Sequence, residues 1–187
     1  MPTIRTFIAV EISRDVRSNL ERWIRSLQPK VNGVKWVETH HLHVTLKFLG
    51  DVAPDHLPEI TDTVSQAAAQ VEPFTLEFFG SGAFPNAKTP RTLRVGCRNG
   101  AEQLTCLAGT IDDALTQLGF PKESRPFSPH LTIGRAKHKV ADLTSLLSAK
   151  PSESFGNCRV SEAVLFSSNL TPPGPIYKKL ATFPLQK

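Results

Sequence analysis

The chain has 187 residues, with 22 Lys plus Arg and 17 Asp plus Glu, so its formal charge is +5. Its 40% apolar and 21% charged residues are typical of a protein that buries a core, and they exclude a disordered tail or a collagen-like repeat. The longest apolar runs are far shorter than the roughly 18 to 20 residues that cross a bilayer. The N-terminus lacks the order of a secretory signal, and the three cysteines show no Cys-x-x-Cys spacing. We therefore expect a cytoplasmic protein with reduced thiols and no membrane segment.

The first half of the chain alternates strand and helix patterns. A β-branched and apolar stretch predicts a strand over 3–12, and apolar positions three and four residues apart predict a helix over 14–27. A short strand is expected over 35–38 and a second helix over 55–71. Between them, residues 41–49 alternate as a half-buried strand does. One face of this strand would carry Leu42, Val44, Leu46 and Phe48, and the other His41, His43, Thr45 and Lys47.

The second half continues the alternation. Strands are predicted over 74–79 and 93–97, with a glycine-rich loop over 80–82 after the first of them. A helix over 101–118, a strand over 130–136, a short helix over 141–147 and strands over 159–167 and 176–183 follow. Several connections are too short for parallel crossovers. The pattern favours an α+β fold with mostly antiparallel sheets.

Two of the predicted strands carry the same four-residue pattern. His43-Val-Thr-Leu46 and His130-Leu-Thr-Ile133 lie 87 residues apart, each on a strand near a long helix. With six His, Thr at 16 of 187 positions and 40% apolar residues, about 0.08 such matches are expected by chance. We therefore expect residues 1–187 to form a single domain of two similar lobes, each with one copy.

The residue types in this pattern suit acid and base catalysis on a phosphate. Residues i and i+2 of a strand point to the same side, so His43 and Thr45 share a face, as do His130 and Thr132. An imidazole with an ordinary pKa of about 6.5 accepts or donates a proton at neutral pH, and a threonine hydroxyl donates a hydrogen bond to a phosphate oxygen. If the strands lie side by side, one histidine can activate a nucleophile while the other protonates the leaving oxygen, without a metal.

Three further segments accompany the two motif strands: Phe7-Ile8-Ala9, Gly82-Ala-Phe84-Pro85 and Gly174-Pro-Ile-Tyr177. The motif strands themselves extend to His43-Val-Thr-Leu-Lys-Phe-Leu-Gly50 and Arg125-Pro-Phe-Ser-Pro-His-Leu-Thr-Ile-Gly-Arg135. Together these segments, which span nearly the whole chain, resemble the 2H phosphoesterase superfamily. Within it they are most similar to the bacterial and archaeal RNA 2′,3′-cyclic phosphodiesterases, also called 2′-5′ RNA ligases.

The resemblance implies a bilobal, pseudo-twofold α+β fold with two mostly antiparallel sheets, flanking helices and a central groove. It implies hydrolysis of a terminal RNA 2′,3′-cyclic phosphate to a 2′-phosphomonoester without metal or cofactor. By position, His43 would donate a proton to the departing 3′-oxygen and His130 would accept one from water, while Thr45 and Thr132 would hold the phosphate.

Two further residues are candidates for substrate binding. Arg135 resembles the family's arginine that follows the second motif, although residues 130, 132 and 134 share a strand face and 135 points away unless the strand bulges. Tyr177 could stack on a base, whereas the alternation places Phe48 on the core side.

Other readings of the same residues stay open. The groove could form a 2′-5′ linkage when a 5′-hydroxyl replaces water, and it could run in both directions, since donor and acceptor exchange roles on reversal. The chain could bind RNA ends without chemistry. A metal hydrolase could use His40, His41 and His43, although a solvated role for the first two fits better. The expected partner is RNA or a nucleotide with a 2′,3′-cyclic phosphate, and nothing demands more than a monomer.

Overall fold

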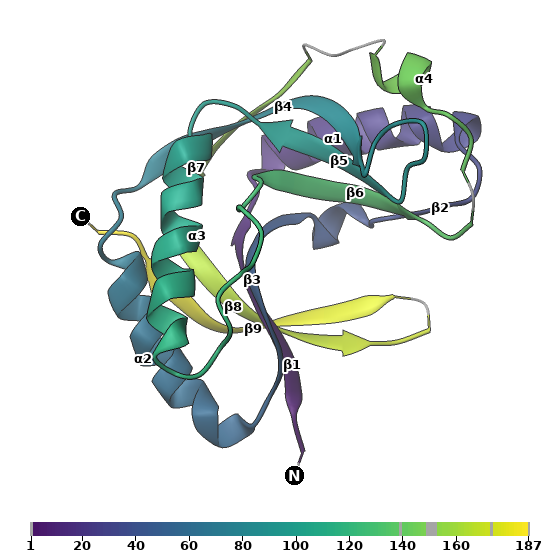
Figure 1. The fold of residues 1–187 in the computed structure, drawn as a ribbon. Coiled ribbons are helices and arrows are strands. Elements are labelled where there is room, and N and C mark those ends of the chain that lie inside the picture. The colour runs from purple at the N-terminus through teal and green to yellow at the C-terminus, as the bar shows by residue number, and fades with distance from the viewer. Residues whose placement is uncertain (1, 139, 149–152, 173, 187) are drawn as a thin grey trace.

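Two antiparallel sheets form the framework of the computed structural model, which describes residues 2–138, 140–148, 153–172 and 174–186 (Figure 1). Sheet A has the strand order β3 (His43–Val52), β1 (Ile4–Glu11), β8 (Glu162–Leu170) and β9 (Pro175–Pro184). Sheet B has the order β2 (Val34–Trp36), β6 (His130–Ala136), β5 (Thr92–Cys97), β4 (Phe74–Phe84) and β7 (Ser154–Val160). The α+β prediction with antiparallel sheets is confirmed.

Three long helices cover the sheets. Helix α1 (Arg14–Leu27) begins after Ser13, whose hydroxyl oxygen accepts a hydrogen bond from the backbone N–H of Val16 at 3.3 Å, and it contacts β7 of sheet B. Helix α2 (Leu57–Ala68) contacts β8 and β9 of sheet A, and α3 (Ala101–Thr116) contacts α2, β3 and β4. Figure 1 shows α2 and α3 side by side and the short α4 (Thr144–Ser148) beyond sheet B. No helix in the described ranges combines the length and apolarity needed to cross a membrane.

Two apolar clusters lie inside the protein. The larger one joins the buried faces of both sheets and all three long helices. A smaller one covers the other side of sheet A and consists of Phe7, Ala9, Val164 and Phe166, with Tyr177 packed against it. We call this second set the aromatic floor, because it lies directly beneath the histidine of β3.

Two strand predictions were wrong. The expected loop over 80–82 is part of β4, because Gly80 adopts a φ of 67° and is absorbed as a bulge opposite β5. The strand expected over 159–167 is two strands, since the chain leaves sheet B after Val160 and enters sheet A at Glu162. Periodicity does not reveal a change of sheet within one apolar stretch.

The predicted faces of β3 were also wrong beyond Leu46. In the pairing with β1, Ala9 lies opposite Thr45 and Ile8 opposite Lys47, so Leu46 is an extra residue in the strand. Such a bulge reverses which side the following residues face. Lys47 is consequently buried, with 3% exposed surface, and Phe48 is 58% exposed.

Candidate active site

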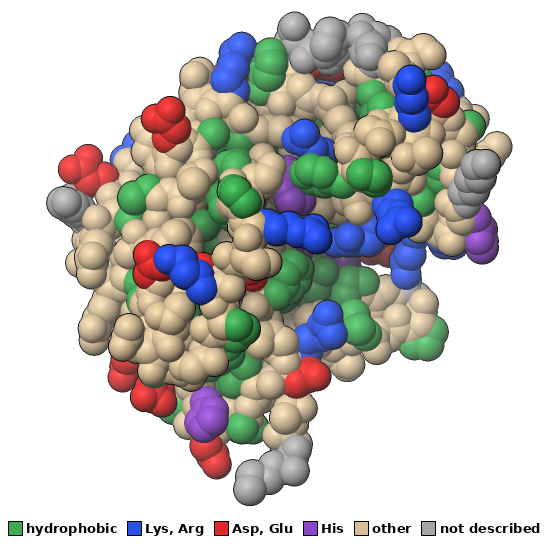
Figure 2. All heavy atoms as spheres, in the orientation of Figure 1, with side chains coloured by type: hydrophobic (Ala, Val, Ile, Leu, Met, Phe, Trp, Pro, Cys, Tyr) green, Lys and Arg blue, Asp and Glu red, His purple; other side chains and the backbone are tan. Residues whose placement is uncertain are grey.

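The two histidine motifs lie on β3 and β6, which contact each other where sheet A meets sheet B. His43 pairs with Glu11 of β1, and His130 pairs with Gly96 of β5. Figure 2 shows this face of the molecule hollowed between its two halves, with Lys and Arg side chains along one wall, hydrophobic side chains along the other and a histidine inside. We call this hollow the groove.

Both imidazoles are held by the same backbone contact. The Nδ1 of His43 lies 2.7 Å from the carbonyl oxygen of His41, and the Nδ1 of His130 lies 2.7 Å from that of Ser128. A carbonyl oxygen only accepts, so Nδ1 carries the proton in each ring. The remaining Nε2 is then a base in the neutral ring and an acid in the protonated ring.

His43 lies on the aromatic floor. Its ring stacks on Phe7 with centroids 4.9 Å apart, and the edge of Tyr177 meets it at 5.4 Å. Burial lowers the pKa of His43 to about 4, helped by the nearby positive charges of His41 and Arg135, while the hydrogen bond to the His41 carbonyl opposes the shift. In the unliganded protein this imidazole is therefore neutral at pH 7.

His130 has a less enclosed environment. The ring of Phe84 meets it edge-on with centroids 5.1 Å apart. Burial lowers the pKa of His130, and the charges of Arg94 and Arg135 act in the same direction, while the hydrogen bond to the Ser128 carbonyl opposes them. A phosphate anion beside the two rings would raise both pKa values again.

The two threonines of the motifs are half-buried beside the histidines. Thr45 pairs with Ala9 across β1, and Thr132 pairs with Arg94 across β5. Within the described ranges, neither hydroxyl has a hydrogen-bond partner in the protein. Both hydroxyls are therefore free to donate to a bound phosphate.

Arg135 faces the groove, contrary to the argument from strand alternation. Arg94 lies opposite Thr132 and Leu93 opposite Gly134, so β6 carries an extra residue at Ile133. The bulge turns Arg135 to the side of the histidines, where its charge lowers the pKa of both His43 and His130. Gly134 allows β2 to approach at the bend, because a Cβ there would lie 2.7 Å from a side-chain carbon of Val34 and would displace it.

The two motif strands are built alike. In each strand the histidine and the threonine are half-buried. The residue after the histidine and the two residues after the threonine are buried, and the fifth residue after the histidine is exposed. That fifth residue is Phe48 in β3 and Arg135 in β6. The ring of Phe48 lies 6.0 Å from that of Phe7, so the groove receives an exposed aromatic face from sheet A and a cation from sheet B.

Tyr177 lies on β9 and contacts the site through ring edges. Its ring meets those of Phe7 at 5.1 Å and His41 at 4.9 Å, besides that of His43. Burial raises the pKa of its hydroxyl. These contacts make Tyr177 a support for the imidazole of His43.

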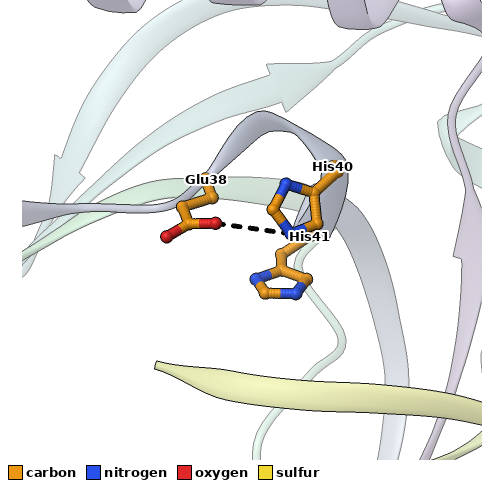
Figure 3. A group of neighbouring side chains, drawn as sticks. All are labelled: Glu38, His40 and His41. Atoms are coloured by element: carbon orange, nitrogen blue, oxygen red, sulfur yellow. Dashed lines mark ion pairs between the residues drawn. The ribbon is translucent and has the colours of Figure 1, made fainter. Parts of the chain in front are cut away.

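The metal-hydrolase alternative assumed that His40, His41 and His43 would converge. The structure instead brings Glu38 beside His40 and His41, with donor atoms within 4.8 Å of one another, at the 3-10 helix Thr39–His41 (Figure 3). His40 Nε2 and Glu38 Oε2 lie 3.3 Å apart as an exposed ion pair. His43 is not a member of this group among the described residues.

One groove residue was missed by the sequence analysis. Arg94 lies on β5 opposite Thr132, and its guanidinium carbon lies 4.6 Å from the centre of the Phe84 ring. The buried neighbours Leu93 and Val95 indicate that Arg94 occupies the other face of the strand. The sequence could not show that β5 pairs with β6, which is what places this arginine beside His130.

Comparison with known proteins supports the fold and the family. A profile described as the 2′-5′ RNA ligase superfamily matches residues 16–171. The chain is 39% identical over 180 residues to an RNA 2′,3′-cyclic phosphodiesterase of Archaeoglobus fulgidus, covering 96% of this chain and 99% of that one. It is 35% identical over 185 residues to the protein of the same name from Aquifex aeolicus, covering 98% of each.

Solved structures agree with the sequence comparison. TT0787 of Thermus thermophilus is 31% identical, with a TM-score of 0.84 and 98% of each chain covered. LigT of E. coli in its apo form is 23% identical, with a TM-score of 0.79 over the full length of both chains, and shares the fold. These matches show that the chain belongs to the 2′-5′ RNA ligase superfamily.

Proposed function

We propose that the protein hydrolyses 2′,3′-cyclic phosphate ends of RNA to 2′-phosphomonoesters, using the two histidines of the groove as acid and base. The single observation that carries this proposal is the matched setting of His43 and His130: each imidazole donates Nδ1–H to a carbonyl oxygen two residues earlier and keeps Nε2 for a ligand. The relatives named RNA 2′,3′-cyclic phosphodiesterase add support for the substrate.

The reaction needs one proton removed and one supplied. Neutral His130 accepts a proton from water as the water oxygen attacks phosphorus, and protonated His43 donates its proton to the 3′-oxygen as the phosphorus–oxygen bond breaks. Thr45 and Thr132 donate hydrogen bonds to the non-bridging oxygens, and Arg135 balances their negative charge. Because the side chains supply acid, base and anion binding, we propose that no metal takes part.

Activity on an oligonucleotide that ends in a 2′,3′-cyclic phosphate tests the proposal. In EDTA the protein should form the 2′-phosphomonoester, and His43→Ala and His130→Ala should each lower the rate by about 10²- to 10⁴-fold while the fold persists. His56→Ala, at an exposed histidine of the 3-10 helix Pro54–His56, should keep full activity. Retained turnover in either groove variant, or loss of activity on chelation, would count against the mechanism.

A substrate that needs no proton donor separates the two roles. When sulfur replaces the bridging 3′-oxygen, the departing thiolate is stable near neutral pH. His43→Ala should then recover activity on the sulfur substrate, and His130→Ala should not. The reverse result would exchange the donor and the acceptor.

Ligation is a second candidate, favoured by the matching backbone hydrogen bonds that hold the two imidazoles. His130 would take the proton from a 5′-hydroxyl in place of water, and His43 would again protonate the departing 3′-oxygen. Rings held in the same way can exchange these roles in the reverse reaction, the cleavage of a 2′-5′ linkage. Excess RNA with a 5′-hydroxyl would reveal this as a 2′-5′ linked product.

We further propose that a single cytoplasmic chain suffices for activity. The histidines, threonines and Arg135 all come from β3 and β6 of one chain. The three cysteines are free thiols, which supports a reducing compartment. Turnover per chain that stays constant on dilution would agree with a monomer.

A further inference from the structure

A second arginine of sheet B lies beside His130 without an anionic partner among the described residues. Arg94 of β5 is half-buried on the groove face, and its Nε is fully buried with no hydrogen-bond partner in the described part of the chain. No carboxylate of the described residues forms an ion pair with it. A buried N–H that lacks an acceptor is costly to maintain, and here the protein supplies neither an acceptor for Nε nor a counter-charge for the guanidinium. The positive charge of Arg94 is therefore available to an anion in the groove.

Arg98, directly after the end of β5, shows how an arginine is paired when a carboxylate is present. Arg98 also lies over a phenylalanine of β4, with its guanidinium carbon 3.9 Å from the centre of the Phe79 ring. Its Nε and Nη2 donate to the carboxylate of Glu77 at 3.0 and 2.8 Å. Arg94 has the aromatic contact at 4.6 Å, to Phe84, but lacks the carboxylate.

The guanidinium of Arg94 packs against the surface of sheet B. A Cβ added to Gly82 would lie 3.7 Å from its Cζ, Nε and Nη2, and one added to Gly96 would lie 3.5 Å from Nη1. The guanidinium therefore lies across β4 and β5 over two residues without side chains, with Phe84 as its third neighbour. Its orientation is set before any substrate arrives.

Arg94 lies on the side of His130 that is farther from sheet A and from His43. The charge of Arg135 acts on both His43 and His130, whereas that of Arg94 is felt at His130 and is not among the influences on His43. In the sheet order, β5 lies one strand, or about 4.8 Å, farther from sheet A than β6 does. Arg135 therefore suits the reacting phosphate, and Arg94 suits an anion next to it.

We propose that Arg94 binds the phosphodiester on the 5′ side of the terminal nucleotide, and so makes the groove selective for oligonucleotides over mononucleotides. This inference rests on the proposed function. A cyclic phosphate occupies the 3′ end of an RNA strand, so the next phosphate along the chain is the one 5′ to the same nucleoside. A guanidinium binds such a phosphate through two parallel hydrogen bonds.

Three substrates and one variant test the proposal. The substrates are a nucleoside 2′,3′-cyclic phosphate, a dinucleotide ending in the same cyclic phosphate, and that dinucleotide with a neutral methylphosphonate at its internal linkage. Each protein is compared at its own pH optimum, because removal of the Arg94 charge also relieves the lowering of the His130 pKa. Arg94→Gln should then lower kcat/KM on the normal dinucleotide by about tenfold or more relative to its effect on the other two substrates. The wild-type protein should lose a similar factor when the linkage is made neutral.

Controls separate binding from folding and from net charge. Arg94→Lys keeps the charge but not the paired donors, and should recover part of the loss. Arg25→Gln removes one charge from α1, where Arg25 pairs with Glu21, and should behave as wild type. Equal loss on all three substrates, or no loss on the dinucleotide, would overturn the proposal.

Binding of the 2′-phosphorylated dinucleotide product gives a readout that needs no turnover. The negative slope of log affinity against log salt should become less steep by about 0.7 in Arg94→Gln, as expected when one phosphate contact is lost from a single strand. An unchanged slope would refute the role of Arg94. Absence of wild-type turnover on every substrate would instead refute the proposed function, and the binding comparison would still decide about Arg94.

Discussion

Replacing His43 by phenylalanine should make the protein more resistant to acid. The ring of Phe7 stacks on His43 at 4.9 Å, and a phenyl ring can keep this contact while removing the group that titrates. In the folded protein the pKa of His43 is lowered to about 4, mainly by burial, whereas the unfolded chain restores the ordinary value of 6.5. The unfolded state therefore binds more protons between these two values, and stability falls as the pH is lowered through that window.

The size of the effect follows from the two pKa values. They differ by about 2.5, and each pKa unit corresponds to about 1.36 kcal/mol, so protonation of this one group costs the folded state about 3 kcal/mol by pH 4. Above pH 6.5 the contribution vanishes, because the imidazole is then neutral in both states. The difference between wild type and His43→Phe should therefore grow only below pH 6.5.

Urea unfolding followed by tryptophan fluorescence at a series of pH values measures this difference. Between pH 7 and pH 4 the free energy of unfolding should fall by about 3 kcal/mol more in wild type than in His43→Phe. The contributions of the other titrating groups are common to both proteins and cancel in the comparison. His130→Phe should differ from wild type in the same direction, since the pKa of His130 is also lowered. Identical pH dependence of wild type and His43→Phe would refute the reasoning that burial on the aromatic floor holds His43 neutral.

Three further outcomes follow from the same structure. Lys47→Met should lower the free energy of unfolding in urea by about 3 to 5 kcal/mol, because it leaves the carboxylate of Asp112 without its buried partner. Adding Asp112→Leu to the same chain should restore most of this free energy. A cost below about 1 kcal/mol would show that the pair is not buried in solution. The pH profile of kcat/KM should be bell-shaped with its optimum below pH 6.5, since both histidine pKa values are lowered; an optimum above pH 7 would contradict this. Phe48→Ala should lower kcat/KM on oligonucleotides by about tenfold if a base stacks on this exposed ring, with unfolding unchanged, and full activity would exclude that contact.

Local patterns in the sequence were sufficient for the general architecture. Apolar spacing of three and four residues located α1, α2 and α3, because an amphipathic helix must turn one face to the core. Alternation located β3, a strand was also predicted where β6 lies, and the repeated tetrapeptide pointed to the two histidines. These features depend only on residues close to one another in the chain.

The failures came from interactions between distant segments. A bulge in β3 and another in β6 arise from pairing with β1 and β5, and each reverses the facing of the residues that follow, which is why Phe48, Lys47 and Arg135 were assigned to the wrong sides. Arg94 was missed for a related reason, since only the pairing of β5 with β6 brings it to His130.

In the proposed mechanism, two imidazoles from different sheets act on one phosphate. A crystal structure of the protein with a bound 2′-phosphomonoester nucleotide tests it most directly. The Nε2 atoms of His43 and His130 should both lie within hydrogen-bond distance of oxygens on the same phosphorus, with the hydroxyls of Thr45 and Thr132 on its remaining oxygens. A phosphate bound by one histidine alone, or away from both, would contradict it.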